Sequence, residues 1–359
     1  MRDNALSPVL GFVLVFAIIV AMIGIIQTLF VPTWIKSVEA KHYFSLKSEF
    51  EELVEKAVDA ANGGISIASF DLILNYPRYP FLLTPATTSS SITVKKIGSV
   101  AISSPILSEP IVLDLLAIEF EPNYHYLDAN EEVMILGDYF SNGVILGESV
   151  LYSGNEINLI VINMSEGTYS GNERIVLYGN PPFTLNSAEV TISLDSDVCN
   201  EYSWYLNFVE NSTGATRSGC NVTFSGKLNL IAASTNESWS VKLAEKLVNS
   251  SFTISDESSA TPLSENTQII SSEGVTYYIT GYTGYSNQPV NVTLEWSEKR
   301  GDNIDSLLTQ NFVWYTLSNG YFQLPITLPE VKGNRDIILE VTLQFPDGSA
   351  KTFSVLFER

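Results

Sequence analysis

The sequence contains few of the residues on which catalytic and metal sites usually depend. Its 359 residues include two cysteines, which form no C-x-x-C pair, and two histidines, His42 and His125. Structural zinc sites need four Cys, His or carboxylate ligands, so this composition argues against one. The G-x-S-x-G nucleophile elbow and the glycine-rich motifs of nucleotide binding are also absent. We therefore expect no enzymatic activity, no metal and no cofactor.

Basic residues are scarce as well. The chain has 19 Lys and Arg against 40 Asp and Glu, for a net charge of -21. Such a surface repels the phosphates of nucleic acids, so we expect no nucleic acid partner. The acidic residues are scattered, and no D-x-D-x-D-G loop of calcium-binding spacing is present. We interpret the acidity as the solubility of an exposed protein.

Charge is missing altogether between Val9 and Phe30, where Gln27 and Thr28 are the only polar residues. Since an α-helix rises about 1.5 Å per residue, this run would reach roughly 30 Å, the thickness of the hydrocarbon core of a bilayer. We predict a transmembrane helix that stays in the mature protein, because the region before it is too short for a secretory signal and no A-x-A cleavage site follows it.

One face of this helix carries small residues. Ala17, Ala21 and Gly24 recur at spacings of four and three, which places them on the same side. Small side chains at such positions let a second helix approach closely within lipid. We predict that these three residues pack against another helix.

An amphipathic helix is predicted to follow, over residues 32–63. Its apolar residues recur every three or four positions and form one stripe: Leu46, Phe50, Leu53, Val54, Ala57, Val58 and Ala61. Asn62-Gly63-Gly64 would end it, and Pro32 would kink the rod or divide it. The stripe is consistent with packing on the chain's own β domain, and also with additional packing against other copies.

From Ile65 onward the pattern changes to short β-branched, alternating segments separated by Gly, Asn, Ser and Pro. The expected fold is therefore an N-terminal transmembrane α-helix continued by an amphipathic helix, then mostly β structure in antiparallel β-sandwich modules. We expect an immunoglobulin-like topology for the last module, although it has no Cys…Trp…Cys pattern.

These patterns divide the chain into six parts. They are a leader at 1–5, a transmembrane or assembly helix at 6–31, an amphipathic helix at 32–63, a first β domain at 64–198, a Ser/Asn/Thr-rich part at 199–262, and a C-terminal β-sandwich at 263–359. One short helix is expected in the Ser/Asn/Thr-rich part, from Ser240 to Val248.

The two cysteines and the glycosylation sequons point to the outside of the cell. Cys199 and Cys220 would form a disulfide in an oxidising compartment; two buried free thiols are the alternative. Six asparagines lie in N-x-S/T sequons: Asn163, Asn211, Asn221, Asn236, Asn249 and Asn291. The lysines after the apolar run would by themselves place the C-terminal part in the cytoplasm, but they alternate with glutamates, so we give the cysteines and sequons precedence.

The C-terminal module is rich in aromatic residues: Tyr277, Tyr278, Tyr282, Tyr285, Trp296, Trp314 and Tyr315. Because they alternate along the predicted strands, most should lie in the core or be half-buried on a sheet. An exposed subset would form a platform for ligands such as sugars, whose apolar faces stack on rings.

The N-terminal block resembles that of archaeal type IV pilin-like proteins. Residues Arg2 to Phe12 read RDNALSPVLGF, a short charged leader followed by a Ser-Pro-Val-Leu-Gly block and a hydrophobic helix. The resemblance implies that a prepilin peptidase cuts at Asn4-Ala5 or Ala5-Leu6, so Asn4, Ala5 and Leu6 form the processing region. It also implies that the retained helices of many subunits bundle into a filament core.

Further segments are similar to a subgroup of large archaeal pilin-like surface proteins. They are Val31 to Trp34, Val38-Glu39, His42, Tyr76 to Phe81, Thr84-Pro85, Tyr124 to Tyr126 and Gly143 to Tyr152. The resemblance covers about the first half of the chain.

Three functions are consistent with these features. The first is a pilin-like structural protein of the archaeal cell surface, with copies of itself or other pilin-like subunits, the membrane and a prepilin peptidase as partners, and with glycosylated β domains that serve adhesion. The second is a membrane-anchored binding protein that never polymerises. The third is an anchored surface enzyme, which paired carboxylates in a cleft would favour.

Overall fold

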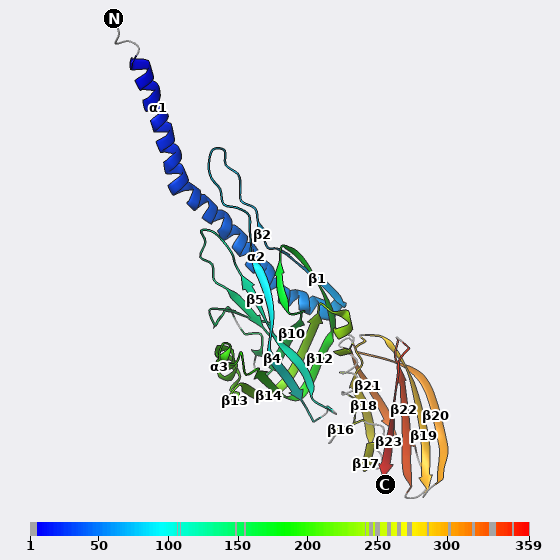
Figure 1. Ribbon diagram of the computed structural model, residues 1–359. Coiled ribbons are helices and arrows are strands. Elements are labelled where there is room, and N and C mark those ends of the chain that lie inside the picture. Colours follow the sequence, from blue (N-terminus) through cyan, green and yellow to red (C-terminus); the bar gives the residue numbers. More distant parts are fainter. Residues whose placement is uncertain are drawn as a thin grey trace.

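The computed structural model describes residues 6–359, apart from 106, 108, 148, 154–155, 241, 244–246, 248–251, 257–259, 264–266, 271–274, 286, 301–302, 318–319, 330–334, 347 and 359. An N-terminal helical rod projects from a β-rich body, and a separate β module lies at the opposite end of the molecule (Figure 1). This confirms the expected fold class.

The rod consists of α1 (Leu6–Ile25), the π-helical turn η1 (Ile26–Phe30) and α2 (Val31–Gly63). The helix continues through Pro32, so the rod is not divided, but it changes direction between α1 and α2, in agreement with the expected kink (Figure 1). In η1 the N–H of Val31 donates to the carbonyl of Ile26, which widens the helix by one residue just before the proline. Pro32 then lies in the first turn of α2, where its missing N–H is tolerated.

The first β body is built around one large sheet. In the described part of the chain this sheet contains β1 (Ile65–Asp71), β4 (Ser91–Ser103), β5 (Ile111–Glu121), β6 (Glu132–Ile135), β7 (Asp138–Ser141), β8 (Val144–Ile145), β9 (Tyr152–Ser153), β10 (Glu156–Asn163), β11 (Gly167–Ser170), β12 (Asn172–Leu194), β13 (Thr216–Ser218) and β14 (Asn221–Ser234). Its central order is β8-β7-β6-β5-β4-β12-β14-β10-β9, and β10 with β14 is a parallel pair.

The strands of this sheet contribute to two cores. Along β5, Leu113 and Leu115 belong to one core, and Leu116 and Ile118 belong to the other. The second core is completed by the apolar stripe of α2, where Leu46, Phe50, Leu53, Ala57 and Ala61 are buried. The stripe of α2 therefore packs on the chain's own β body.

Gly179 on β12 permits this close packing. A Cβ at this position would lie 2.3 Å from the carbonyl carbon of Ala60, so no side chain fits between the helix end and the strand. The helix stops there because Gly64 has a φ of 85°, and the carbonyl of Gly64 accepts a hydrogen bond of 3.1 Å from the N–H of Gly179.

Two features of the first body differ from the expectation. β14 lies between β12 and β10, so the expected boundary between residues 198 and 199 is wrong: the Ser/Asn/Thr-rich part supplies a central strand of the first sheet. The hairpin of β6 and β7 was not expected, because its turn uses Leu136, with a φ of 50°, instead of the Asn or Asp that marks such turns.

The Ser/Asn/Thr-rich part also contains helix. α3 (Ser203–Thr213), which was not expected, buries Tyr205, Leu206 and Val209 against the first core. Of the expected helix from Ser240 to Val248, residues 240, 242, 243 and 247 are helical, and the others lie outside the described residues.

The C-terminal module is a two-sheet sandwich. In its described part, one sheet has the order β16-β15-β18-β21 and the other β17-β23-β22-β19-β20. The strand bounds are β15 (Thr253–Ser255), β16 (Ala260–Pro262), β17 (Thr267–Ile270), β18 (Thr276–Tyr282), β19 (Pro289–Arg300), β20 (Asn303–Tyr315), β21 (Tyr321–Thr327), β22 (Asp336–Gln344) and β23 (Ala350–Glu358). β15, β18 and β21 take the positions of immunoglobulin strands A, B and E, and β19, β22 and β23 those of C, F and G. The expected immunoglobulin-like topology is confirmed.

Aromatic side chains join the two β bodies. The hydroxyl of Tyr282 donates to the carbonyl of Pro181, and the hydroxyl of Tyr321 donates to that of Thr184. Pro181 lies at a register shift in β12 between Asn180 and Phe183, and Thr184 follows that shift. The shift leaves Pro181 without a partner in the ladder, so its carbonyl can accept a hydrogen bond from the module.

Candidate assembly and anchoring site

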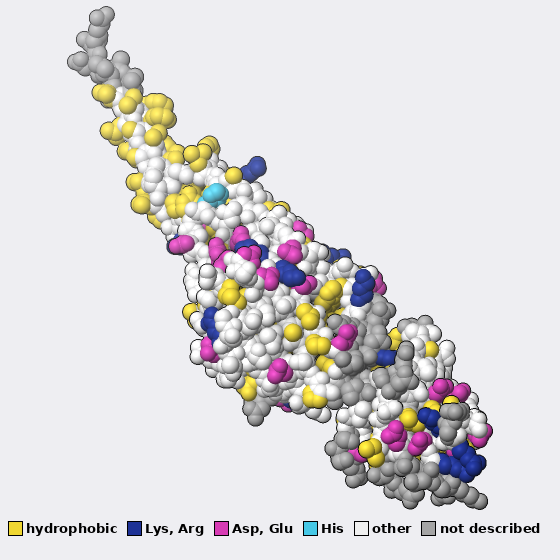
Figure 2. Space-filling view, turned by 60° about the horizontal axis from the view of Figure 1, so that its bottom comes forward, with side chains coloured by type: hydrophobic (Ala, Val, Ile, Leu, Met, Phe, Trp, Pro, Cys, Tyr) yellow, Lys and Arg dark blue, Asp and Glu magenta, His cyan; other side chains and the backbone are white. Residues whose placement is uncertain are grey.

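α1 presents a long and continuous apolar surface. Every side chain from Leu10 to Ile25 is exposed, and Phe12 is 73% exposed. Figure 2 shows these hydrophobic side chains gathered along the rod, whereas acidic and basic side chains lie over the β-rich body. The helix Leu10–Asn62 is long and apolar enough to cross a membrane. It can therefore anchor the chain in a bilayer.

The small residues of α1 lie where a second helix could reach them. Ala17, Ala21 and Gly24 are exposed, and a Cβ at Gly24 would meet nothing within 4 Å. The face is therefore uncovered by the described part of this chain. Of the predicted processing region, Asn4 and Ala5 lie outside the described residues, and Leu6 is the first residue of α1.

The polar groups near the end of the apolar run are satisfied within the protein. The Thr28 hydroxyl donates to the carbonyl of Gly24 at 2.9 Å, and the Thr33 hydroxyl donates to that of Leu29 at 3.0 Å. Gln27 Nε2 donates to the carbonyl of Leu83 at 2.8 Å, and its Oε1 accepts from the N–H of Leu83, also at 2.8 Å. These bonds remove the cost of placing the side chains in an apolar environment.

Leu83 belongs to a long loop that runs up beside the rod. This loop, residues 75–87, joins β2 (Ile73–Leu74) to β3 (Thr88–Ser89), and we call it the tip loop. It rises from the body towards α1 (Figure 1). The ring of Tyr79 packs against that of Trp34 with centroids 5.6 Å apart.

A buried carboxylate fixes the rod to a second loop. Glu39 on α2 is fully buried, and its Oε1 accepts from the Tyr76 hydroxyl at 2.7 Å and from the N–H of His125 at 2.9 Å. Its Oε2 accepts from the N–H groups of Tyr126 and Leu127 at 3.0 and 2.8 Å. Four donors on one carboxylate repay its desolvation and hold both loops against the helix.

The histidines lie at the same junction and make structural contacts. His42 Nε2 lies 2.9 Å from the carbonyl oxygen of Asp71, and its Nδ1 lies 2.9 Å from the Tyr124 hydroxyl. Burial raises the pKa of Tyr124 to about 12, so this hydroxyl stays protonated at neutral pH. The ring of His125 packs against that of Tyr76 with centroids 5.5 Å apart.

Segments far apart in the sequence therefore meet around the base of the rod. Trp34, Glu39 and His42 contact Tyr79, Tyr76 and Tyr124 respectively. The sequence did not predict these contacts or the pairing of Gln27 with Leu83. The available signal was a polar residue, Gln27, inside an apolar run.

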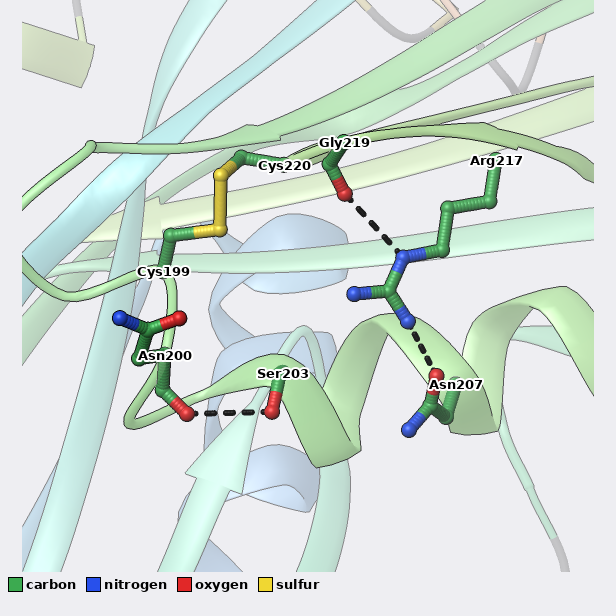
Figure 3. The surroundings of a disulfide bond; sticks show 7 residues. All are labelled: Cys199, Asn200, Ser203, Asn207, Arg217, Gly219 and Cys220. Atoms are coloured by element: carbon green, nitrogen blue, oxygen red, sulfur yellow. Dashed lines mark hydrogen bonds between the residues drawn. A yellow bond between two sulfur atoms is a disulfide. The ribbon is translucent and has the colours of Figure 1, made fainter.

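Cys199 and Cys220 form a disulfide with Cα atoms 5.8 Å apart, so the predicted bridge is confirmed. It ties the segment before α3 to the start of β14 (Figure 3). Nearby, Arg217 donates from Nε to the carbonyl of Gly219 at 3.1 Å and from its guanidinium to Asn207 on α3. A disulfide indicates exposure to an oxidising compartment.

Most sequon asparagines are accessible. Four of them are exposed: Asn211, Asn221, Asn236 and Asn291. Asn163 is half-buried, and its Oδ1 accepts from the Ser234 hydroxyl at 3.2 Å. Asn249 lies outside the described residues. The exposed positions are compatible with attached glycans.

A groove lies between the two β bodies. Its volume is about 540 Å³, and the described residues that line it include Thr184, Asn186, Thr280, Tyr321 and Gln323. The lining offers hydroxyls and amides beside apolar and aromatic side chains. Among the described residues, no group of three or more His, Cys, Asp or Glu is placed to hold a metal ion.

The aromatic residues of the C-terminal module divide as expected into buried and exposed sets. Tyr277, Tyr282 and Trp296 are buried, and Trp296 packs against Phe357. Tyr278, Tyr285 and Trp314 are half-buried. Tyr315, on the edge strand β20, is 65% exposed.

No family model matches the sequence. A protein of Archaeoglobus fulgidus, named only as an uncharacterized protein, is 28% identical over 243 residues. The similarity covers 63% of this chain and 40% of that protein. The chain is therefore similar to part of a longer archaeal protein, and the comparison gives no activity for either.

Proposed function

We propose that this chain is a type IV pilin-like structural protein of the archaeal cell surface. It assembles through α1 into a filament or surface complex and displays its β bodies outside the cell. The observation that carries the proposal is the exposure of every α1 side chain from Leu10 to Ile25. Such a surface must be covered by lipid or by other helices. The pilin-like N-terminal block favours a helix that first lies in lipid and then packs against the helices of other subunits.

The assembly contact is assigned to the face of Ala17, Ala21 and Gly24. Without a large side chain there, two backbones can approach closely enough for extensive van der Waals contact. The partners are copies of this chain or other pilin-like subunits, the membrane, and a prepilin peptidase that removes the leader at Asn4-Ala5 or Ala5-Leu6. We propose neither a nucleic acid partner nor an enzymatic activity.

The location outside the cell is supported by two independent features. The Cys199–Cys220 disulfide favours an oxidising compartment, and four exposed sequons lie on the β bodies. The exposed sequons would carry the glycans of the displayed domains, and the outer module would serve adhesion.

The proposal is tested by the N-terminus of the native protein. Mass spectrometry is applied to membranes and to material sheared from the cell surface. A mature chain that begins at Ala5 or Leu6 in the sheared fraction is expected. A chain that retains Arg2 and occurs only in membranes would show a signal-anchored protein and reject the filament role.

A second candidate is a membrane-anchored binding protein that does not polymerise. The groove of about 540 Å³ between the β bodies favours it, because hydroxyls, amides and Tyr321 suit a neutral polar ligand such as a glycan. This candidate would be supported over the first if the intact chain binds glycans, if Gln323→Ala abolishes that binding, and if no filament forms.

A further inference from the structure

The tip loop ends in two apolar side chains that point away from the protein. Phe81 is 93% exposed and Leu83 is 80% exposed. Leu82, between them, packs instead with the apolar cluster formed by Val31, Ile35 and Tyr76 at the base of the rod. The loop is thus held to the helix by one side chain while its neighbours face outward.

The backbone of the loop favours this outward display. Phe81 has a φ of 64°, in the left-handed region that bulky residues rarely adopt. The reciprocal hydrogen bonds between Gln27 and Leu83 hold the next turn of chain in place. The left-handed backbone conformation and the exposure of a phenylalanine to water each cost free energy. Backbone strain of this kind marks functional positions.

The position of the loop along the rod identifies what surrounds it. Gln27 lies 18 residues after Val9, and at about 1.5 Å per residue this is about 27 Å along the apolar run. For a helix close to the membrane normal, Gln27 is just inside the far edge of a hydrocarbon core roughly 30 Å thick. Leu83 is hydrogen-bonded to Gln27, so the tip loop reaches the same depth in the bilayer as Gln27.

The residues further along the rod match the polar boundary of a bilayer. Trp34 and Tyr79 pack together beyond Gln27, and Trp and Tyr concentrate where the hydrocarbon meets the headgroups. Arg78, in the same loop, is exposed and can reach lipid phosphates. The order along the rod, with Phe81 and Leu83 beside Gln27 and Tyr79 beside Trp34, follows the polarity gradient of a membrane surface.

We infer that the tip loop is a second membrane contact: Phe81 and Leu83 insert into the edge of the hydrocarbon layer on the side of the β bodies. The loop and α1 then hold the body at a defined height and orientation above the bilayer. This inference rests on the membrane span and goes beyond filament assembly. It holds for the anchored chain whether or not the chain polymerises.

Nitroxide depth measurement tests the inference on the full chain. The native cysteines are paired, so Phe81→Cys and Leu83→Cys can be labelled singly and reconstituted in phosphatidylcholine vesicles at low protein content. Val13→Cys, within α1, provides the lipid reference. Ile270→Cys, which replaces an apolar residue that is 84% exposed in the C-terminal module, provides the water reference.

Collision rates with oxygen and with a water-soluble nickel chelate are compared. Labels at 81 and 83 are expected to have an oxygen-to-nickel ratio severalfold above that of Ile270→Cys and approaching that of Val13→Cys. A ratio equal to that of Ile270→Cys would place the loop in water and overturn the inference. Protection from both reagents that increases with protein content would show that a second copy covers the loop, which also overturns it. The filament proposal is tested separately by the mature N-terminus, so the two can fail independently.

Discussion

Gln27 and Leu83 are 56 positions apart in the sequence and exchange two hydrogen bonds of 2.8 Å. The side-chain amide of Gln27 thereby bonds both the N–H and the carbonyl of Leu83, as the backbone of a neighbouring β-strand would. One contact satisfies the polar residue of the apolar helix and fixes the tip loop beside it. It links the apolar helix to the β-rich body.

The substitution Gln27→Leu should release the tip loop while keeping the helix apolar. Two hydrogen bonds are lost, worth on the order of 2 kcal/mol together, so the loop should open roughly thirtyfold more often. Limited proteolysis between residues 77 and 83 in detergent measures this opening. Thr28→Val is the matched control, because the Thr28 hydroxyl bonds only within the helix. Equal cleavage rates in the two variants would contradict the prediction.

The substitutions Ala17→Leu and Gly24→Leu should block assembly, since each places a large side chain on the face where helices approach. The yield of sheared filaments, relative to membrane-bound protein, measures the effect. Val15→Leu is the control: it also enlarges α1, but on the opposite face. Filament yields that are unchanged by Ala17→Leu and Gly24→Leu would reject close packing on this face.

The substitution Glu39→Gln should loosen both loops at the base of the rod. Each carboxylate oxygen of Glu39 accepts from two donors, so either orientation of a glutamine places its NH₂ group against two N–H or O–H donors. We expect a loss of about 3 kcal/mol. Hydrogen exchange at the amides of His125, Tyr126 and Leu127 should accelerate more than tenfold. Glu52→Gln, at an exposed position of α2, should leave the exchange unchanged. Unaltered protection in Glu39→Gln would show that the carboxylate is dispensable.

Replacing both Cys199 and Cys220 by Ser should destabilise the first body by about 3 kcal/mol, because the unfolded chain is no longer closed into a loop. The 21-residue separation between the two cysteines includes α3. The buried side chains of α3 should therefore become more accessible to solvent. Thermal unfolding with and without dithiothreitol measures the effect. The reductant should lower the Tm of the native chain and leave that of the double variant unchanged. A Tm insensitive to both changes would contradict the prediction.

Lys351 should make the stability of the C-terminal module depend on alkaline pH. Burial lowers the pKa of Lys351 from 10.5 to about 8, and its ammonium lies 5.2 Å from the ring centroids of Phe252 and Phe353. Between pH 8 and 10.5 the unfolded chain binds more protons at this site than the folded chain, so its contribution to stability increases with pH in that window. Below pH 8 the folded module must hold a partly desolvated charge.

Lys351→Met removes that charge. The variant should therefore have a higher Tm than the native chain at pH 7, and the difference should shrink as the pH approaches 10.5. Lys41→Met, at an exposed position of α2, should show no such trend. A Tm difference that is constant with pH would show that folding does not shift the pKa of Lys351 and would contradict the prediction.

Several elements were predictable because their signals are local. The apolar run gave α1, and the apolar stripe gave most of α2, since a helix repeats every 3.6 residues. β14 was missed although Val222, Phe224, Leu228 and Leu230 alternate correctly, because the surrounding Ser, Asn and Thr resembled a loop. The edge strand β20 is exposed along most of its length, so no alternation of buried and exposed residues marks its first half.

The sequence by itself determined the apolar N-terminal helix, the β-rich body and a feasible cysteine pair, because helix and strand periods depend on each residue's own backbone geometry. Only the tertiary structure decided which distant segments meet. It placed β14 between β12 and β10, Glu39 beneath the loop of His125, and Leu83 against Gln27. Such contacts depend on packing and on the closure of long loops, and neither leaves a fixed spacing in the sequence.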